Sequence, residues 1–146
     1  MNYMQAVLDN KTVTVPALAW FIAQTLKVLI CIFIYKNYTF DRWFGSGGMP
    51  SSHTAYVISL TAVLGKNHGL SSTSFGIAVA FSFIVMYDAV GVRRAAGKQA
   101  QLLNSLMTTH FAGEEFYEKL KELLGHKPLE VFVGALLGLA IGINFG

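Results

Sequence analysis

The chain has 146 residues, of which 53% are hydrophobic and only 13% are charged, with a formal net charge of +3. Soluble domains carry about 25% charged residues, so this composition fits neither a soluble globule nor a disordered chain. A disulfide-stabilised scaffold is excluded as well, because Cys31 is the only cysteine. The remaining class is a small integral membrane protein, and we expect residues 1–146 to form one membrane-embedded domain.

Four apolar windows predict membrane-spanning helices. The first has 20 residues, the length that crosses a hydrocarbon core of about 30 Å. The second has 15 residues and spans only about 22 Å as a helix, so its start must lie inside the membrane boundary or in a cavity. Strand patterns are absent, and we expect an all-α transmembrane bundle of about four spans. The windows are Pro16–Tyr35, Pro50–Leu64, Phe75–Val92 and Pro128–Phe145.

A polar stretch, Arg93–Lys127, connects the third window to the fourth. Within it, Ala95–Met107 contains few helix breakers and predicts one helix. Glu114–Leu124 predicts a second, amphipathic helix, with leucines on one side and the pair Glu115 and Lys119 on the other. We expect this helical stretch to lie at the membrane interface.

Four spans place both termini on one side of the membrane. Lys11 and Lys66 fall on that side, whereas eight basic residues fall on the other. The positive-inside rule therefore predicts that the loops at 36–49 and 93–127 face the cytoplasm and that both termini face outward from the cell membrane. The eight residues are Lys36, Arg42, Arg93, Arg94, Lys98, Lys119, Lys121 and Lys127.

The segment at 46–54, SGGMPSSHT, is the most informative part of the sequence. Gly48 and its neighbouring glycine allow a tight turn, and the proline suits the first position of a helix. Backbone amides at such a helix start bind phosphate, and the hydroxyls of Ser51 and Ser52 add donors. His53 can transfer a proton near neutral pH. The alternative is an ordinary capped helix start, in which the serines make only local hydrogen bonds.

A second candidate site opens the fourth window, in the sequence GHKPLE. His126 and Glu130 are four residues apart and can meet on one helix face. A carboxylate bonded to one ring nitrogen fixes the tautomer and leaves the other nitrogen free to attack. The alternative is a structural role, because a glutamate at the third helical position commonly caps the helix.

Several ionisable residues close the third window. Arg94 and Lys98 are four residues apart on one helix face, and Arg93 stands beside them. Arginine binds phosphate through two hydrogen bonds, although each of these cations is also consistent with a positive-inside signal. Asp88 lies inside a span, so we expect it to pair with an arginine or to support the site.

Three further cations are candidates for a supporting role. Lys27 interrupts the first window and either extends to the interface or projects into a polar cavity. Lys36 and Arg42 are candidate phosphate ligands, although interfacial charges of this kind are common. The predicted spans place His53, His126 and the arginine pair at one membrane face. This arrangement suits phosphoryl transfer through a histidine.

The segments PSSHT and HKPLE resemble the Pro-Ser-Gly-His and His-x-Pro-x-Asp motifs of the type 2 phosphatidic acid phosphatase and vanadium haloperoxidase superfamily. Together with YDAVGVRR, they make the chain similar to the divergent membrane branch of that superfamily over roughly residues 15–145. The resemblance implies that His126 is the phosphate-accepting nucleophile, Glu130 its orienting carboxylate and His53 the general acid. It places the two preceding serines among the phosphate-binding groups, and it implies neither a metal nor a cofactor.

The chain departs from the family pattern in several places. Glu130 replaces an aspartate, and Ser52 replaces a glycine. The family arginine six to seven residues before the nucleophile is missing, and the cations that follow the third window are our hypothesis for its substitute. In the first family motif, Lys36 and Arg42 are separated by five residues rather than six.

We therefore expect an acid-phosphatase-like membrane enzyme that hydrolyses a lipid phosphate or diphosphate monoester, such as phosphatidate or a polyprenyl phosphate, through a phosphohistidine intermediate. The alternatives are an inactive protein that binds or transports lipid phosphates and a structural subunit of a larger complex. The expected partners are the bilayer and the lipid substrate, and no nucleic acid. Gly134, Gly138 and Gly142 permit close helix packing within one chain or between the two chains of a homodimer.

Overall fold

The computed structural model describes residues 2–33, 48–110, 120, 122 and 124–146, and this part of the chain is helical with short connections. Three helical stretches are long and apolar enough to cross a membrane, namely α2, α4 together with α5, and α6. The prediction of a multispan all-α bundle is confirmed. The helices are α1 (Tyr3–Leu8), α2 (Lys11–Phe33), α3 (Ser52–His68), α4 (Thr73–Val90), α5 (Val92–His110) and α6 (Pro128–Phe145).

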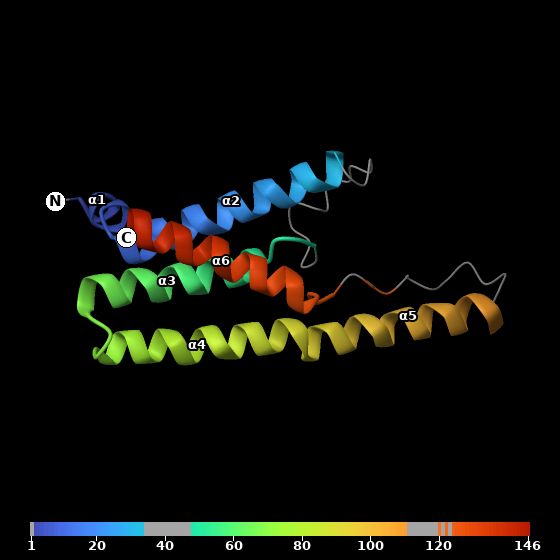
Figure 1. Ribbon diagram of the computed structural model, residues 1–146. Coiled ribbons are helices and arrows are strands. Elements are labelled where there is room, and N and C mark those ends of the chain that lie inside the picture. Colours follow the sequence, from blue (N-terminus) through green and yellow to red (C-terminus); the bar gives the residue numbers. More distant parts are fainter. Residues whose placement is uncertain (1, 34–47, 111–119, 121, 123) are drawn as a thin grey trace.

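Helix α3 occupies the second predicted window and is the central helix of the bundle. It packs against α2, α4 and α6 (Figure 1). Its 17 residues extend over about 26 Å, which is less than the thickness of a hydrocarbon core. The short helix expected from the sequence is therefore present, and its beginning lies against the other helices of the bundle, but α3 is not among the stretches long and apolar enough to cross a membrane.

Helix α5 continues α4 almost in line and extends beyond the rest of the bundle (Figure 1). Gly91 separates the two helices, and its backbone N–H donates to the carbonyl of Tyr87 at the end of α4. The helix predicted over Ala95–Met107 is confirmed as the main part of α5.

The amphipathic helix predicted over Glu114–Leu124 is wrong at the positions the structure describes, because Leu120, Glu122 and Leu124 are not helical. Asn104 of α5 gives the physical reason. Its side-chain amide donates to the carbonyl of Leu120 at 2.8 Å, and its side-chain oxygen accepts from the Leu120 N–H at 2.9 Å. Both backbone groups of Leu120 are thus bonded to a side chain instead of to a helical neighbour. Residues 114–119, 121 and 123 of this prediction lie outside the described residues.

The glycine stripe of α6 packs directly against α3 in the same chain. A Cβ atom added at Gly134 would lie 2.5 Å from the carbonyl oxygen of Ser51, and one added at Gly142 would lie 2.6 Å from the Cβ of Ala62. Gly138 approaches the carbonyl oxygen of Ala55 more closely still. The sequence left open whether this stripe serves packing within a chain or between chains, and the structure shows packing within the chain.

Polar contacts also join the helices. The hydroxyls of Thr61 and Ser82 are 2.8 Å apart, and both donate to the carbonyl of Val57, which connects α3 to α4. At the end of the bundle where both termini lie (Figure 1), Lys66 donates to the carbonyl of Ile143 at 3.1 Å. A cation is favourable there because the C-terminal end of a helix carries a partial negative charge.

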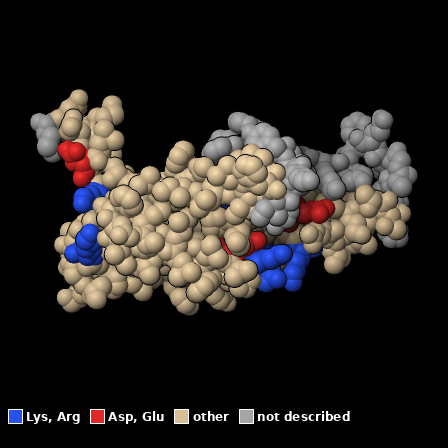
Figure 2. Space-filling model, turned by 45° about the horizontal axis from the view of Figure 1, so that its top comes forward, with Lys and Arg blue, Asp and Glu red and all other residues tan. Residues whose placement is uncertain are grey.

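The surface agrees with a position in a membrane. Figure 2 shows that the described surface along the bundle is largely uncharged, and that Lys and Arg gather in two places. One lies at the end that holds the termini, and the other lies toward the end from which α5 extends.

We predict that Gly138→Ala destabilises the protein by about 1–3 kcal/mol, because the added Cβ would overlap the carbonyl oxygen of Ala55 and force α3 and α6 apart. The control is Gly76→Ala in α4, where an added Cβ meets open space. This variant should be as stable as the parent or more so, since alanine favours helix over glycine. Thermal unfolding of the purified proteins in detergent tests this, and equal loss of stability in both variants would contradict it.

Candidate functional site

His53 and His126 border one pocket of about 110 Å³. Its lining residues come from the beginnings of α3 and α5, the end of α4 and the segment before α6, and these parts of the chain lie at the end of the bundle away from the termini (Figure 1). We call it the histidine pocket. Its lining residues are His53, Val85, Asp88, Ala89, Arg93 and His126.

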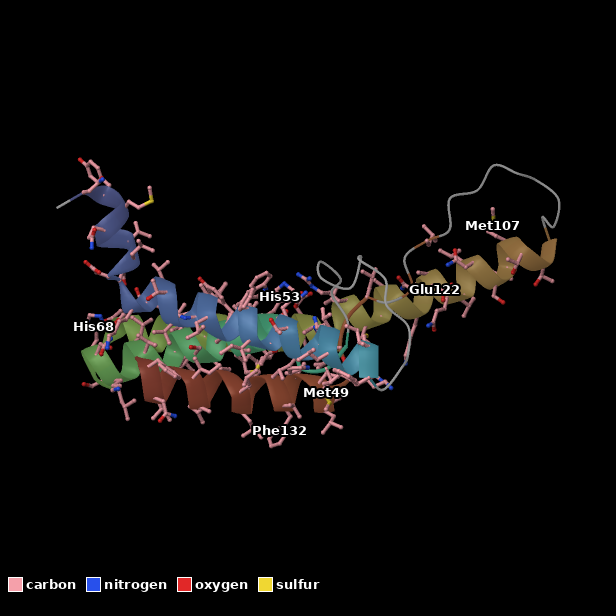
Figure 3. All side chains as sticks on the ribbon, turned by 90° about the horizontal axis from the view of Figure 1, so that it is seen from above. Met49, His53, His68, Met107, Glu122 and Phe132 are labelled. Carbon is pink, nitrogen blue, oxygen red and sulfur yellow. The ribbon has the colours of Figure 1, made fainter. Side chains whose placement is uncertain are left out.

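The two histidines come from different parts of the fold. His53 is exposed in the first turn of α3, at the opposite end of that helix from His68 (Figure 3). His126 is only 3% exposed and precedes the first residue of α6 by two positions. Its backbone N–H donates to the carbonyl of Ala89 at 2.9 Å, which attaches the start of α6 to the end of α4.

Gly125 allows the chain before His126 to approach α5 closely. It has a φ of +80°, which an L side chain rarely adopts, and a Cβ at this position would overlap the backbone of Arg94. The segment that carries His126 therefore lies directly against the beginning of α5. This contact brings the basic residues of α5 to the same region as the histidine.

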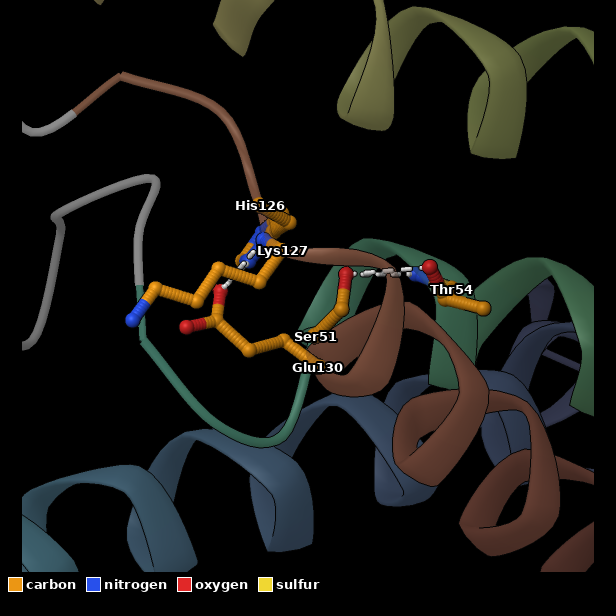
Figure 4. A network of polar contacts seen from close by, with 5 residues as sticks. All are labelled: Ser51, Thr54, His126, Lys127 and Glu130. Carbon is orange, nitrogen blue, oxygen red and sulfur yellow. Dashed lines mark hydrogen bonds and ion pairs between the residues drawn. The ribbon is translucent and has the colours of Figure 1, made fainter.

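Glu130 performs both roles that the sequence left open. Its Oε2 atom accepts a hydrogen bond from the backbone N–H of Lys127 at 3.1 Å, which caps α6, and it lies 3.0 Å from Nδ1 of His126 (Figure 4). With the carboxylate ionised, Nδ1 carries the proton and donates it, so the lone pair is on Nε2. Within the part of the chain that the structure describes, the buried Nε2 atom makes no hydrogen bond of normal geometry, and the backbone of Gly48 is close enough to the ring to raise the pKa of His126.

The surroundings of His126 favour its neutral form. Burial lowers the pKa of His126 below its usual value, because the charged ring loses its hydration. The hydrogen bond to Glu130 acts in the opposite direction, and the positive charge of Lys27 lowers the pKa further. A neutral imidazole with a free lone pair is the form in which histidine acts as a nucleophile.

Lys27 lies inside the bundle and not at its surface. It is 2% exposed, and its Cγ atom would be 3.4 Å from a Cβ at Gly48. Its charge acts on both His53 and His126. Of the two alternatives that the sequence left open, burial therefore excludes an extension to the surface, and Lys27 lies near the site without lining the histidine pocket. Lys36 and Arg42 lie outside the described residues.

The structure divides the predicted cations between two pockets. Arg93 lines the histidine pocket, where its Nε atom donates to Oδ2 of Asp88, so the pairing expected for Asp88 is present. Arg94 and Lys98 line a separate cavity of about 240 Å³, which we call the α5 pocket. His126 borders both pockets. The other residues of the α5 pocket are Gly48, Gly97, Gln101, Glu122, Leu124, Gly125, Lys127 and Glu130.

The two serines are not brought into either pocket. Ser51 and Ser52 are buried and are absent from the lining of the histidine pocket and of the α5 pocket. The hydroxyl of Ser51 accepts from the backbone N–H of Thr54 at 3.4 Å and from its hydroxyl at 3.0 Å (Figure 4). Ser51 is therefore the N-cap of α3, which agrees with the structural alternative. Gly48 contributes its backbone to the α5 pocket, with a φ of +93°.

Sequence reasoning missed the contribution of the segment before His126. Glu122 lines the α5 pocket and accepts from the side-chain amide of Asn104 at 2.7 Å, and it lies beside α5 in Figure 3. The one available signal was the polar Asn104, which directly follows two leucines in the predicted helix. No group of three or more His, Cys, Asp and Glu side chains able to hold a metal ion is found among the residues that could be searched.

The chain was compared with known proteins. Residues 8–141 match the family model described as the Divergent PAP2 family. The chain is also similar to the uncharacterized membrane protein YuiD of Bacillus subtilis (strain 168), with 40% identity over 131 residues, covering 82% of this chain and 83% of YuiD. No solved structure matches it. The region matched by the family model contains His53, His126 and Glu130, and similarity to a membrane protein agrees with the apolar helices of the bundle.

We predict that Glu130→Gln lowers the pKa of His126, because the carboxylate that stabilises the protonated ring is lost while the burial remains. An NMR titration of the His126 ring in detergent measures this pKa. Glu122→Gln is the control, since the Glu122 carboxylate bonds Asn104 and should leave the pKa of His126 unchanged. An unchanged or raised pKa in Glu130→Gln would contradict the assignment of the hydrogen bond.

Proposed function

The chain belongs to the divergent PAP2 family, and on that premise we propose that it hydrolyses a phosphate or diphosphate monoester of a membrane lipid through a phosphohistidine. One observation carries the proposal. The Nδ1 atom of His126 is held by Glu130 while its buried Nε2 atom makes no hydrogen bond of normal geometry to the described residues, and the same ring borders a pocket with His53. This is the arrangement of an oriented nucleophile beside a proton donor.

The reaction has two steps. In the first, the lone pair of His126 Nε2 attacks phosphorus, and the bond between phosphorus and the ester oxygen breaks. Protonated His53 gives its proton to the leaving oxygen, and Glu130 stabilises the charge on the His126 ring through Nδ1. In the second step, His53 takes a proton from water as that water attacks phosphorus, and the N–P bond breaks to release inorganic phosphate and neutral His126.

The cations around the site would stabilise the phosphoryl oxygens. Arg93 lines the histidine pocket, and the charge of Lys27 acts on both histidines. Arg94 and Lys98 line the α5 pocket, which also borders His126, so a second phosphate of a diphosphate would have cations of its own. Preorganised positive charge of this kind lowers the barrier to phosphoryl transfer.

Binding without turnover is the second candidate function. It is favoured by the ion pair between Arg93 and Asp88, which neutralises the arginine of the histidine pocket. In that case the protein would hold a lipid phosphate against the same residues and release no inorganic phosphate.

We predict that purified protein in lipid nanodiscs releases inorganic phosphate from lipid phosphate monoesters such as phosphatidate or a polyprenyl phosphate. His126→Ala should abolish release because the nucleophile is lost. His53→Ala should lower kcat by about 10²–10⁴-fold, as expected when a general acid is removed. The matched control is His68→Ala, which removes a histidine at the far end of α3 (Figure 3). Equal release by all four proteins would refute the proposal, and saturable binding without release would indicate the second function.

The side of the membrane that holds the site is also part of the proposal. Among the described cations, Arg93, Arg94, Lys98 and Lys127 lie around this end of the bundle, whereas Lys11 and Lys66 lie at the end with the termini. We place the site at the cytoplasmic face on the basis of this asymmetry.

Labelling of single cysteines tests the orientation in intact cells. In a Cys31→Ala background, a membrane-impermeant maleimide should label Ser71→Cys, between α3 and α4, and should not label Gln99→Cys in α5 until the cells are permeabilised. Both positions are exposed, so the reagent has access to each of them. The reverse pattern would place the site at the outer face.

A further inference from the structure

An apolar groove leads away from the histidine pocket along the side of the bundle. It has a volume of about 420 Å³, which lies within the usual range for a small-molecule site. We call it the apolar groove. Its walls come from α2, α3 and α4, and the lining includes Ala17, Trp20, His53, Tyr56, Phe81 and Val85.

The apolar groove and the histidine pocket share two residues, His53 and Val85. The polar pocket therefore adjoins the apolar groove at His53 itself. On the groove side, Ala17, Trp20 and Phe81 are all exposed on the outside of the bundle. In a membrane these side chains would contact hydrocarbon, so a ligand could reach the groove from within the bilayer.

The two cavities differ in chemistry, since one is polar and the other is apolar. The histidine pocket holds two histidines and an ion pair, whereas the apolar groove has no charged lining residue apart from His53 if that ring is protonated. A free phosphate or a water-soluble ester would use the pocket and leave the groove unfilled. A ligand that fills both must have an anionic head joined directly to a hydrocarbon chain.

We infer that the substrate of the proposed phosphatase is the phosphate monoester of a single-chain lipid alcohol, whose hydrocarbon chain lies in the apolar groove. The inference rests on the proposed function, since it assigns a substrate class to the same site. His53 then stands where the ester oxygen joins the head to the chain, and its proton passes to the leaving alkoxide to form the free lipid alcohol. Phosphatidate fits less well, because its glycerol ester groups would enter a groove whose accessible wall is apolar.

The binding experiment uses Trp20 as the reporter. In a Trp43→Phe background Trp20 is the only tryptophan, and it lines the groove. The probe is hexadecylphosphonate brominated in the middle of its chain, which the protein cannot hydrolyse because carbon is bonded directly to phosphorus. In nanodiscs of phosphatidylcholine, a low mole fraction of this probe should quench Trp20 saturably, and more strongly than equally brominated hexadecanol or phosphatidylcholine.

A pair of variants shows whether the quenching arises in the groove. Ala17→Phe adds an aromatic ring to the wall of the groove and should weaken probe binding about tenfold or more, the effect expected when a ligand chain is displaced from its pocket. Ala140→Phe adds the same ring to an exposed position of α6 that is not part of the groove, and it should bind the probe like the parent. Both alanines are exposed, so neither change overfills the core.

Hydrolysis by the same proteins separates the two proposals. The parent should have a higher kcat/KM for hexadecyl phosphate than for dioleoyl phosphatidate, and Ala17→Phe should reduce this preference about tenfold. Phosphonate binding without release of phosphate from any ester would overturn the hydrolytic function and leave the groove assignment in place. Release that is insensitive to Ala17→Phe, or quenching by brominated phosphatidylcholine equal to that by the phosphonate, would overturn the groove assignment and leave hydrolysis in place.

Discussion

The contact between the beginnings of α3 and α6 is the constraint on which the site depends. Gly134 approaches the carbonyl oxygen of Ser51, and the backbone N–H of Ser51 donates to the carbonyl of Glu130 at 3.0 Å. Because His53 follows Ser51 by two residues and His126 precedes Glu130 by four, this one contact places both histidines at the same end of the bundle. A side chain on the glycine would separate the helices and with them the two rings.

Glu130 shows how a structural role and a chemical role can be carried by the same atom. At the third position of α6, its side chain is long enough to turn back and accept the Lys127 N–H, so the helix start holds the carboxylate in place. The same oxygen then orients the ring of His126. The capped end of the helix thereby positions the histidine, and the longer glutamate in place of the family's aspartate suits this double contact.

The site joins a polar pocket, which contains charged side chains, to an apolar groove. The histidine pocket and the α5 pocket lie where the bundle ends and basic residues gather, while the apolar groove opens between helices that are suited to contact lipid. His53 lines both the histidine pocket and the apolar groove, because the first turn of α3 lies where the two cavities meet. An amphiphilic ligand would match this boundary, since its head and its chain differ in the same way as the two cavities.

The sequence alone determined the features that depend on residues close together in the chain. These were the apolar helical windows and the four-residue spacing of the glycine stripe, which follow from helical periodicity, and the closeness of His126 and Glu130 in the chain. Only the tertiary structure decided that Lys27 points inward, that Arg93 and Arg94 serve different pockets, and that Asn104 holds Leu120 out of a helix. These outcomes depend on contacts between segments distant in the chain, which local propensity and spacing do not encode.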